Sequence, residues 1–279
     1  MDIVDAQLHL GKKVGVPEAL ASMDALGIQA AIVDEFWGLD PASGHPQPGY
    51  VLPQGVFRPV GPSAEQAAIC HPTRFSFLLR VDHRDPDLNE RLGYLASAPH
   101  AHAVRLDAQP ASAAVDFAAG RCERLFAAAA RYALPVFVLC PGQAARLRAY
   151  AARYPEITVI VDHVGSPGNE QQFADLLALA DLPNVAVKWA HATTSFDAHD
   201  YPFERTIPYL RRCLDAFGCR RLMWASDVTE VQGGHPWAEL LFSVRDSGAL
   251  SAEEKTWVLG QTVRTLLHWP RLTDGEGGC

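Results

Sequence analysis

The chain has 279 residues, 48% of them hydrophobic, a net charge of −8 and six scattered cysteines without a C-x-x-C pair. A chain of this length can bury one large hydrophobic core. Because it has no Lys- or Arg-rich run, it lacks the positively charged surface that binds nucleic acid or an anionic membrane. No apolar stretch approaches the roughly 18 residues of a membrane span, and the N-terminus lacks the pattern of a secretory signal. We therefore expect a cytoplasmic protein with reduced thiols that binds a small molecule, and a homo-oligomer is compatible with the sequence.

Short apolar or β-branched runs alternate along the chain with longer Ala- and Leu-rich amphipathic stretches, which is typical of repeated βα units around a parallel sheet. The predicted strands are residues 2–6, 30–34, 75–81, 103–107, 135–140, 158–162, 185–189 and 221–225. Helical spacing of apolar residues predicts helices between them, for example over 121–132, 144–153 and 209–217. No break in composition divides the chain, and no G-x-G-x-x-G or Walker loop follows a strand. The sequence therefore favours one closed (β/α)8 barrel over residues 1–279 rather than an open nucleotide-binding sheet.

One connection is long: residues 36–62, after the second strand, contain six prolines and five glycines. We predict that neither helix nor strand propagates through this loop. On the face where barrel enzymes place their chemistry, a stiff segment bearing Trp37 would form a lid over a pocket. The alternative is an arm with a structural or oligomer-contact role.

Ionisable side chains follow three separate predicted strands. Alternation along the first strand places Asp5, Gln7 and His9 on one face, His163 follows the sixth strand, and Asp227 follows the eighth. The carboxyl ends of barrel strands meet at the catalytic face. The sequence therefore predicts that His9, His163 and Asp227 converge within a few ångströms to form a catalytic set.

Three cations lie inside predicted strands, namely Arg80, Arg105 and Lys188. A buried cation without an anion is costly, so each needs a negative partner. Two interpretations stand: the cations bind an anionic substrate, or they pair with neighbouring acids such as Asp34 and Asp107. His191, just after the seventh strand, is either a hydrogen-bond donor in the pocket or an ordinary loop residue.

Several segments resemble one known family. The start D-A-x-x-H is found at Asp5–His9, D-H-x-G at Asp162–Gly165 and R-L-M-W-x-S-D at Arg221–Asp227, while Gly260–Leu266 resembles G-x-N-A-x-x-L loosely. These motifs are similar to those of the amidohydrolase-2 family, the TIM-barrel predicted metal-dependent hydrolases that include sugar lactonases and 2-pyrone-4,6-dicarboxylate hydrolase. The resemblance implies a TIM-barrel hydrolase.

One departure from the family pattern concerns the metal. The family usually begins with H-x-H, whereas Gln7 stands here at the position of the first histidine. An amide is a poor zinc ligand, so His9, His163 and Asp227 would be three metal ligands with a weak or absent fourth. The expected cofactor is therefore either none or a single divalent metal such as zinc.

The resemblance and the residues together predict hydrolysis of a lactone or cyclic ester of a small anionic molecule. Asp227 would activate water as general base, while His163, together with His9, would polarise the carbonyl. The residues expected to contact the substrate are Gln7, Arg80, Arg105, Lys188, His191 and Trp37. Two alternatives remain open: a metal-dependent decarboxylase of an unsaturated or aromatic acid, and a barrel that binds a ligand without catalysis.

Overall fold

The structure is a computed structural model, which describes residues 1–271 except 12, 35–48, 60–62, 110 and 231–233. Eight strands in the described part form one sheet in the order β1-β2-β5-β6-β7-β8-β9-β10, and each hydrogen-bonded neighbour is parallel. The strands are β1 (Val4–Leu8), β2 (Ala30–Asp34), β5 (Phe75–Val81), β6 (Ala101–Asp107), β7 (Val136–Leu139), β8 (Val159–Val161), β9 (Val185–Trp189) and β10 (Leu222–Trp224). The predicted (β/α)8 barrel is thus confirmed.

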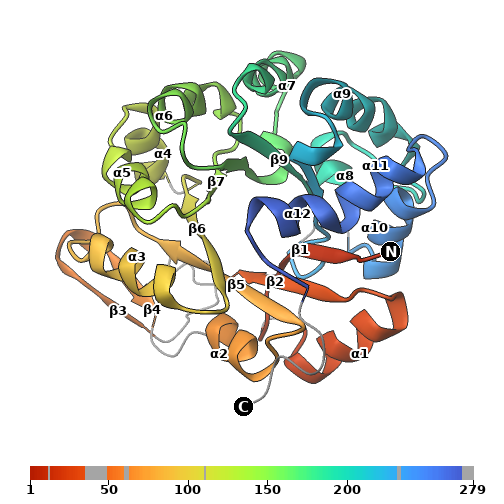
Figure 1. Cartoon of the computed structure of the whole chain (residues 1–279). Helices are drawn as coiled ribbons and strands as arrows, with labels where there is room; N and C mark the ends of the chain where they lie inside the picture. The colour runs from red at the N-terminus through yellow and green to blue at the C-terminus, as the bar shows by residue number, and fades with distance from the viewer. Residues whose placement is uncertain (12, 35–48, 60–62, 110, 231–233, 272–279) are drawn as a thin grey trace.

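The helices lie on the outside of the barrel, except that α12 (Thr262–Leu266) lies across one end of it (Figure 1). They are α1 (Val16–Leu26), α2 (Ser63–Cys70), α3 (Leu88–Ser97), α4 (Ala111–Ala118), α5 (Glu123–Arg131), α6 (Leu147–Arg153), α7 (Glu170–Leu177), α8 (Ala192–Ser195), α9 (Ile207–Phe217), α10 (Trp237–Arg245), α11 (Ala252–Thr256) and α12 (Thr262–Leu266). Among the described residues, no helix combines the length and apolar character needed to cross a membrane. The five described cysteines are all free thiols.

The interior of the barrel has two layers of different chemistry. One inward-facing position on each of seven strands is apolar, and these positions are Ile32, Leu78, Ala103, Phe137, Ile160, Ala186 and Met223. Two residues further along five strands, the next inward position is charged, and these positions are Asp34, Arg80, Arg105, Asp162 and Lys188. Side chains alternate along a strand, so this spacing of two stacks a charged layer directly on the apolar one. The charged layer lies at the carboxyl ends of the strands.

A bulge interrupts strand β1. Its register against β2 shifts between Asp5 and Leu8, after Val4 and Ala6 have packed into the apolar layer. Beyond the shift, Gln7 contacts the interior while Leu8 packs outward against the helices. The expectation that Asp5, Gln7 and His9 share one face is therefore wrong for Asp5, because the extra residue changes the alternation. The strand itself also begins two residues later than predicted.

Side chains and a distorted helix close the seam between β1 and β10. The Asp5 carboxylate accepts hydrogen bonds from the backbone N–H of Ser226 at 2.9 Å and the Trp237 indole at 2.7 Å. A π-helical turn, Trp257–Gln261, contacts both strands and brings Gly260 against the Asp2 carbonyl. The segment that follows, with Val263, Leu267 and Trp269, joins the apolar layer and fills the end of the barrel opposite the charged layer.

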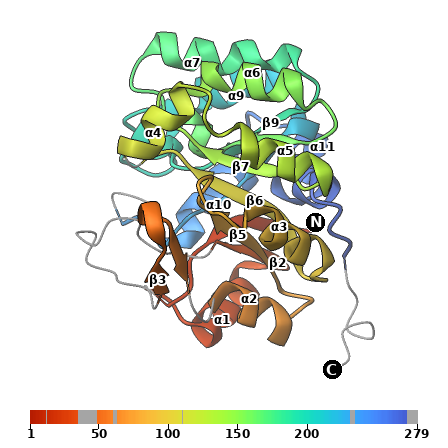
Figure 2. The same cartoon turned by 90° about the vertical axis from the view of Figure 1, so that its left-hand side faces the viewer.

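The loop predicted over 36–62 is only partly described. Strands β3 (Gly49–Val51) and β4 (Phe57–Pro59) pair antiparallel around a 3-10 turn, Pro53–Gly55. The prediction that no strand forms in this loop is therefore wrong for its second half, because the prolines occupy the turn and the strand end rather than the ladder. Figure 2 shows the hairpin on the side away from the N-terminus. Trp37 lies outside the described residues, and a lid stays a prediction.

Candidate active site

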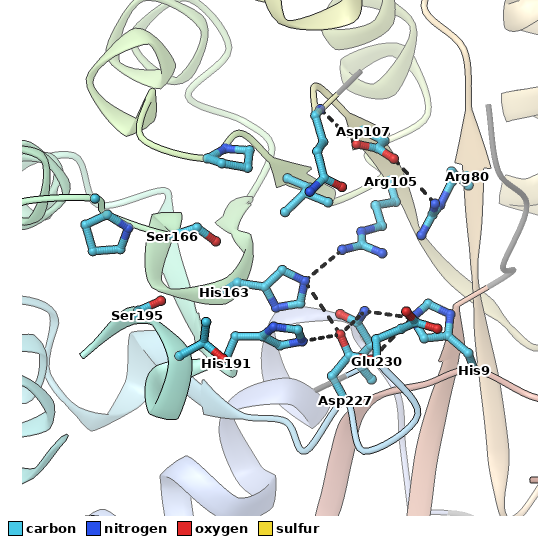
Figure 3. Close-up of a pocket in the computed structure, with 17 residues that line it drawn as sticks. His9, Arg80, Arg105, Asp107, His163, Ser166, His191, Ser195, Asp227 and Glu230 are labelled. Carbon is cyan, nitrogen blue, oxygen red and sulfur yellow. Dashed lines mark hydrogen bonds and ion pairs between the residues drawn. The ribbon is translucent and has the colours of Figure 1, made fainter. Parts of the chain in front are cut away.

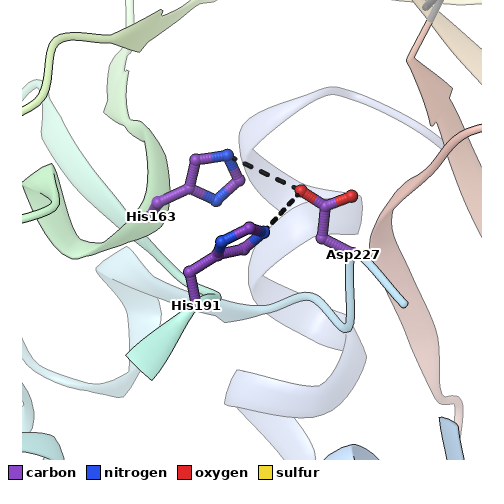
Figure 4. Close-up of side chains that lie close together, drawn as sticks. All are labelled: His163, His191 and Asp227. Carbon is purple, nitrogen blue, oxygen red and sulfur yellow. Dashed lines mark hydrogen bonds and ion pairs between the residues drawn. The ribbon is translucent and has the colours of Figure 1, made fainter. Parts of the chain in front are cut away.

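Three side chains meet above the charged layer. His163, His191 and Asp227 follow β8, β9 and β10, and all three offer nitrogen or oxygen atoms within 4.8 Å of one another (Figure 4). His191 Nε2 lies 3.0 Å from Asp227 Oδ2, and His163 Nε2 lies 3.6 Å from the same oxygen. Each has a left-handed backbone, with φ of 51°, 53° and 45°. Non-glycine residues in this conformation carry strain and cluster at functional sites.

Strand β1 supplies the other side of Asp227. His9 Nε2 lies 3.3 Å from Asp227 Oδ1, and the Gln7 amide nitrogen donates to Oδ2 at 2.9 Å. His9 Nδ1 lies 3.0 Å from the carbonyl oxygen of Asp34, which can only accept, so Nδ1 carries a proton. The structure thus brings the predicted set of His9, His163 and Asp227 together, and it adds His191 to that set.

The charged layer forms a continuous network beneath the cluster. Asp34 accepts from Arg80 Nη2 at 2.6 Å and from Arg105 Nη1, and Arg105 Nε donates to Asp162 at 2.6 Å. Lys188 Nζ lies 2.6 Å from Asp162 Oδ1. Of the two interpretations of the strand cations, pairing with acids is therefore the one that the described contacts support.

Burial and neighbouring charges set the protonation of the cluster. Burial alone would raise the pKa of Asp227, but the adjacent imidazoles of His9 and His191 outweigh it and hold that pKa well below the usual range. Burial, followed by the positive charge of Lys188, holds the pKa of His163 well below that of a free histidine. His163 is therefore neutral, and Arg105 Nη2 donates to its Nε2 at 3.2 Å. Its proton accordingly lies on Nδ1, which has no hydrogen-bond partner among the described residues.

A cavity of about 570 Å³ opens above these groups (Figure 3). Most of the residues that line it have polar side chains, and the lining comprises Gln7, His9, Arg80, Arg105, Asp107, Gln109, Leu139, Pro141, His163, Ser166, Pro167, Gly168, His191, Thr194, Ser195, Asp227 and Glu230. In Figure 3, Ser166 and Ser195 lie across the cavity from Arg80 and His9.

The predicted substrate contacts divide into three groups. Gln7, Arg80, Arg105 and His191 line the cavity. Lys188 does not line the cavity, because its side chain is 0% exposed and lies beneath the cavity floor. The structure therefore gives Lys188 no direct contact with a substrate in this cavity. Trp37 lies outside the described residues.

Sequence reasoning missed Glu230, which lines the cavity three residues after Asp227. The signal was present, since a second acid in the loop after the last strand lies on the catalytic face.

Comparisons with known proteins agree with this architecture. The family model described as amidohydrolase, Amidohydro_2, matches residues 62–269, which is 208 of the 279 residues. The chain therefore belongs to the amidohydrolase family.

Individual relatives are more distant. A 95-residue segment is 33% identical to L-fucono-1,5-lactonase of Burkholderia ambifaria, and the match spans 32% of each protein. A zinc-bound amidohydrolase from Burkholderia multivorans superimposes with a TM-score of 0.74 at 20% identity, covering 97% of this chain and 100% of that one. A putative 2-pyrone-4,6-dicarboxylic acid hydrolase from Pseudomonas putida gives 0.73 at 16% identity, covering 96% and 97%. At these identities the solved structures show the fold.

The residues that could hold a divalent ion are His163, His191 and Asp227. Two imidazoles and a carboxylate that is ionised form a donor set typical of catalytic zinc. The predicted metal set of His9, His163 and Asp227 needs correction, because His9 approaches the other oxygen of Asp227 and the compact group contains His191 instead. Gln7 directs its amide nitrogen, not its oxygen, at Asp227.

Proposed function

We propose that this protein hydrolyses a lactone or similar cyclic ester, with Asp227 as the general base. The observation that carries the proposal is the Asp227 carboxylate, held ionised at the cavity floor among three imidazoles. The partial match to a lactonase supports the same reaction class.

The two oxygens of the Asp227 carboxylate have different partners. Asp227 Oδ2 is engaged by Gln7 and His191, whereas Oδ1 lies 3.3 Å from His9 Nε2. In the proposed reaction a water oxygen attacks the lactone carbonyl carbon while Oδ1 accepts the water proton. Collapse of the tetrahedral intermediate breaks the ring C–O bond, and the same proton passes to the leaving alkoxide. The product is an open-chain hydroxy acid.

Two side chains that line the cavity beside Asp227 can donate hydrogen bonds, namely His163 and Arg105. His163 has an uncommitted N–H at Nδ1, and the Arg105 guanidinium lies against the same ring. Fixed donors aimed at a developing oxyanion lower the barrier because they need no reorganisation during the reaction. We assign His163, supported by Arg105, to this role.

A divalent ion held by His163, His191 and Asp227 would supply a Lewis acid for the carbonyl oxygen. The following tasks describe the chain without the ion, because a histidine nitrogen that ligates a metal cannot also donate a hydrogen bond. His191 orients the Asp227 carboxylate, and His163 faces the carbonyl.

The charges of the cavity favour an uncharged, hydroxylated lactone over the anionic substrate expected from the sequence. Arg80 already pairs with Asp34 and Asp107, and Arg105 with Asp34 and Asp162. The lining also includes the acids Asp107, Asp227 and Glu230, so the wall offers a carboxylate substrate no surplus of positive charge. The hydroxyls at the mouth, from Ser166, Thr194 and Ser195, suit hydrogen bonding to sugar hydroxyls.

The test is a panel of sugar lactones and dicarboxylate lactones, assayed with wild type and Asp227→Asn. The variant keeps the size of the side chain but removes the base, and we expect kcat to fall about 10²- to 10⁴-fold. The matched control is Asp175→Asn on α7, a half-buried aspartate that accepts a hydrogen bond from Gln171 and lies outside the cavity, and this variant should retain wild-type activity. Full activity in Asp227→Asn, or carbon dioxide release from an aromatic acid without lactone turnover, would refute the proposal.

A further inference from the structure

The Gln7 side chain joins three elements of the site. Its Oε1 accepts a hydrogen bond from Lys188 on β9, and its Nε2 lies 2.9 Å from Asp227 Oδ2 and 3.1 Å from His9 Nε2. The side chain is only 1% exposed. All the polar atoms of this amide are therefore committed inside the protein.

Lys188 fixes which way the amide points. Both described polar contacts of its Nζ, Gln7 Oε1 and Asp162 Oδ1, are oxygen acceptors, so Nζ donates in each. An amide that turned over would place its NH₂ group against this donor, with no water available at a site that is 0% exposed. Lys188 thus sets the Gln7 oxygen toward β9 and the Gln7 NH₂ toward Asp227.

This orientation determines how the base is presented. With Gln7 and His191 both donating to Oδ2, the Asp227 carboxylate cannot rotate without losing a hydrogen bond, and Oδ1 stays on the side of His9. We infer that Gln7, held by Lys188, is a positioning residue that orients Asp227 for proton transfer. The inference rests on the proposed function in one respect, namely that Asp227 is the base.

The β1 bulge makes this contact available. Without the register shift between Asp5 and Leu8, the alternation set by Val4 and Ala6 would direct residue 7 outward, away from Lys188 and Asp227. The bulge therefore turns a position that would pack against helices into one that spans the cavity floor. Lys188, although sealed below the cavity, gains through Gln7 an influence on the chemistry.

The test compares Gln7→Met, Lys188→Met and the double variant with wild type. Methionine has a similar volume but neither the donor nor the acceptor of glutamine. The matched control is Gln29→Met at the opposite end of the barrel, where the glutamine also accepts one hydrogen bond, from Ile3 N–H, and donates one, to the Gly27 carbonyl. If Gln7→Met fails to fold, Lys188→Met tests the same contacts, because it keeps Gln7 but removes the donor that orients the Gln7 amide toward Asp227.

We expect kcat on a lactone substrate to fall about 100-fold in Gln7→Met and in Lys188→Met, because small misplacements of catalytic groups have effects of that size. The KM should change by less than about threefold, and the double variant should lose little more than either single one, as residues acting as a unit do. The Gln29→Met control should retain wild-type constants. Losses that multiply in the double variant, a change confined to KM, or an equal loss in Gln29→Met would overturn the inference.

A second readout needs no turnover. The imidazole ¹⁵N signals of His9 and His191 report their contacts with Gln7 and Asp227, and they should shift in Gln7→Met and Lys188→Met but not in Gln29→Met. Unchanged signals would overturn the positioning role. A wild-type protein that opens no lactone would instead refute the proposed function, so the two failures are distinguishable.

Discussion

Asp5 links the stability of the barrel to pH. Its carboxylate is fully buried at the seam between β1 and β10, where it accepts from Gln7 N–H, Ser226 N–H and hydroxyl, and the Trp237 indole. Burial outweighs these hydrogen bonds and raises its pKa from 3.8 to about 6. The folded protein therefore binds this proton more tightly than the unfolded chain does.

The direction and size of the effect follow from linkage. The stability contributed by the protonated carboxyl is complete below pH 3.8, and it is lost as pH rises through the folded pKa of about 6. A shift of roughly 2 pKa units corresponds to about 3 kcal/mol, of which about 2 kcal/mol falls between pH 4.5 and 7.5. For a chain of this length, 2 kcal/mol corresponds to about 3 °C in Tm.

The perturbation is Asp5→Asn, which has nearly the same shape but no titrating group. The variant loses a hydrogen bond from Trp237 at every pH, so its Tm lies below that of wild type throughout. Because only wild type acquires the buried charge, the gap between the two Tm values should narrow by about 3 °C from pH 4.5 to 7.5. Thermal unfolding followed by circular dichroism measures this gap. All other titrating groups are the same in the two proteins, so their contributions to the difference in Tm cancel. Parallel Tm profiles, or a gap that widens with pH, would refute the reasoning.

Two further outcomes are expected. Gly260→Ala would place a Cβ 1.9 Å from the Asp2 carbonyl oxygen, and because backbone must then move, we expect a loss of about 1–3 kcal/mol in unfolding free energy. The control is Gly248→Ala, whose added Cβ would have no atom of the described residues within 4 Å, and equal Tm values for the two variants would contradict the packing argument. Dialysis against EDTA, checked by elemental analysis, should leave lactone turnover unchanged, because the His9 and His191 imidazoles already hold the Asp227 base ionised without an ion; loss of turnover that zinc restores would contradict this expectation.

The fold could be predicted from sequence because its signals are local and repeated. The strand limits 30–34, 75–81 and 185–189 agree with β2, β5 and β9, since each is an apolar run bounded by turn residues. The site residues His163 and Asp227 could be predicted for the same reason. Each is a polar residue that follows an apolar strand, and barrel geometry brings the carboxyl ends of the strands together.

Other features of the site depend on contacts that are distant in sequence. The β1 bulge leaves no mark in the alternation of Val4, Asp5 and Ala6, so Asp5 could not be separated from Gln7 without the register against β2. Lys188 has the same inward spacing as Arg80 and Arg105, and only its pairing with Asp162 shows that it lies below the cavity rather than in its wall. His191 could be recognised as a pocket residue, but its bond to Asp227 requires the three-dimensional arrangement.

The charged layer costs stability, and that cost bears on its role. Apolar residues of similar size at Arg105, Asp162 and Lys188 would extend the layer formed by Ala103, Ile160 and Ala186, and such replacements of buried ion networks are often neutral or stabilising. Stability alone therefore gives no reason for a charged layer at this depth. What it does provide is a set of fixed dipoles under the cavity: Arg105 holds His163 with its proton on Nδ1, and Lys188 holds the Gln7 amide toward Asp227. A floor whose donors cannot reorient is what stabilising a developing oxyanion requires.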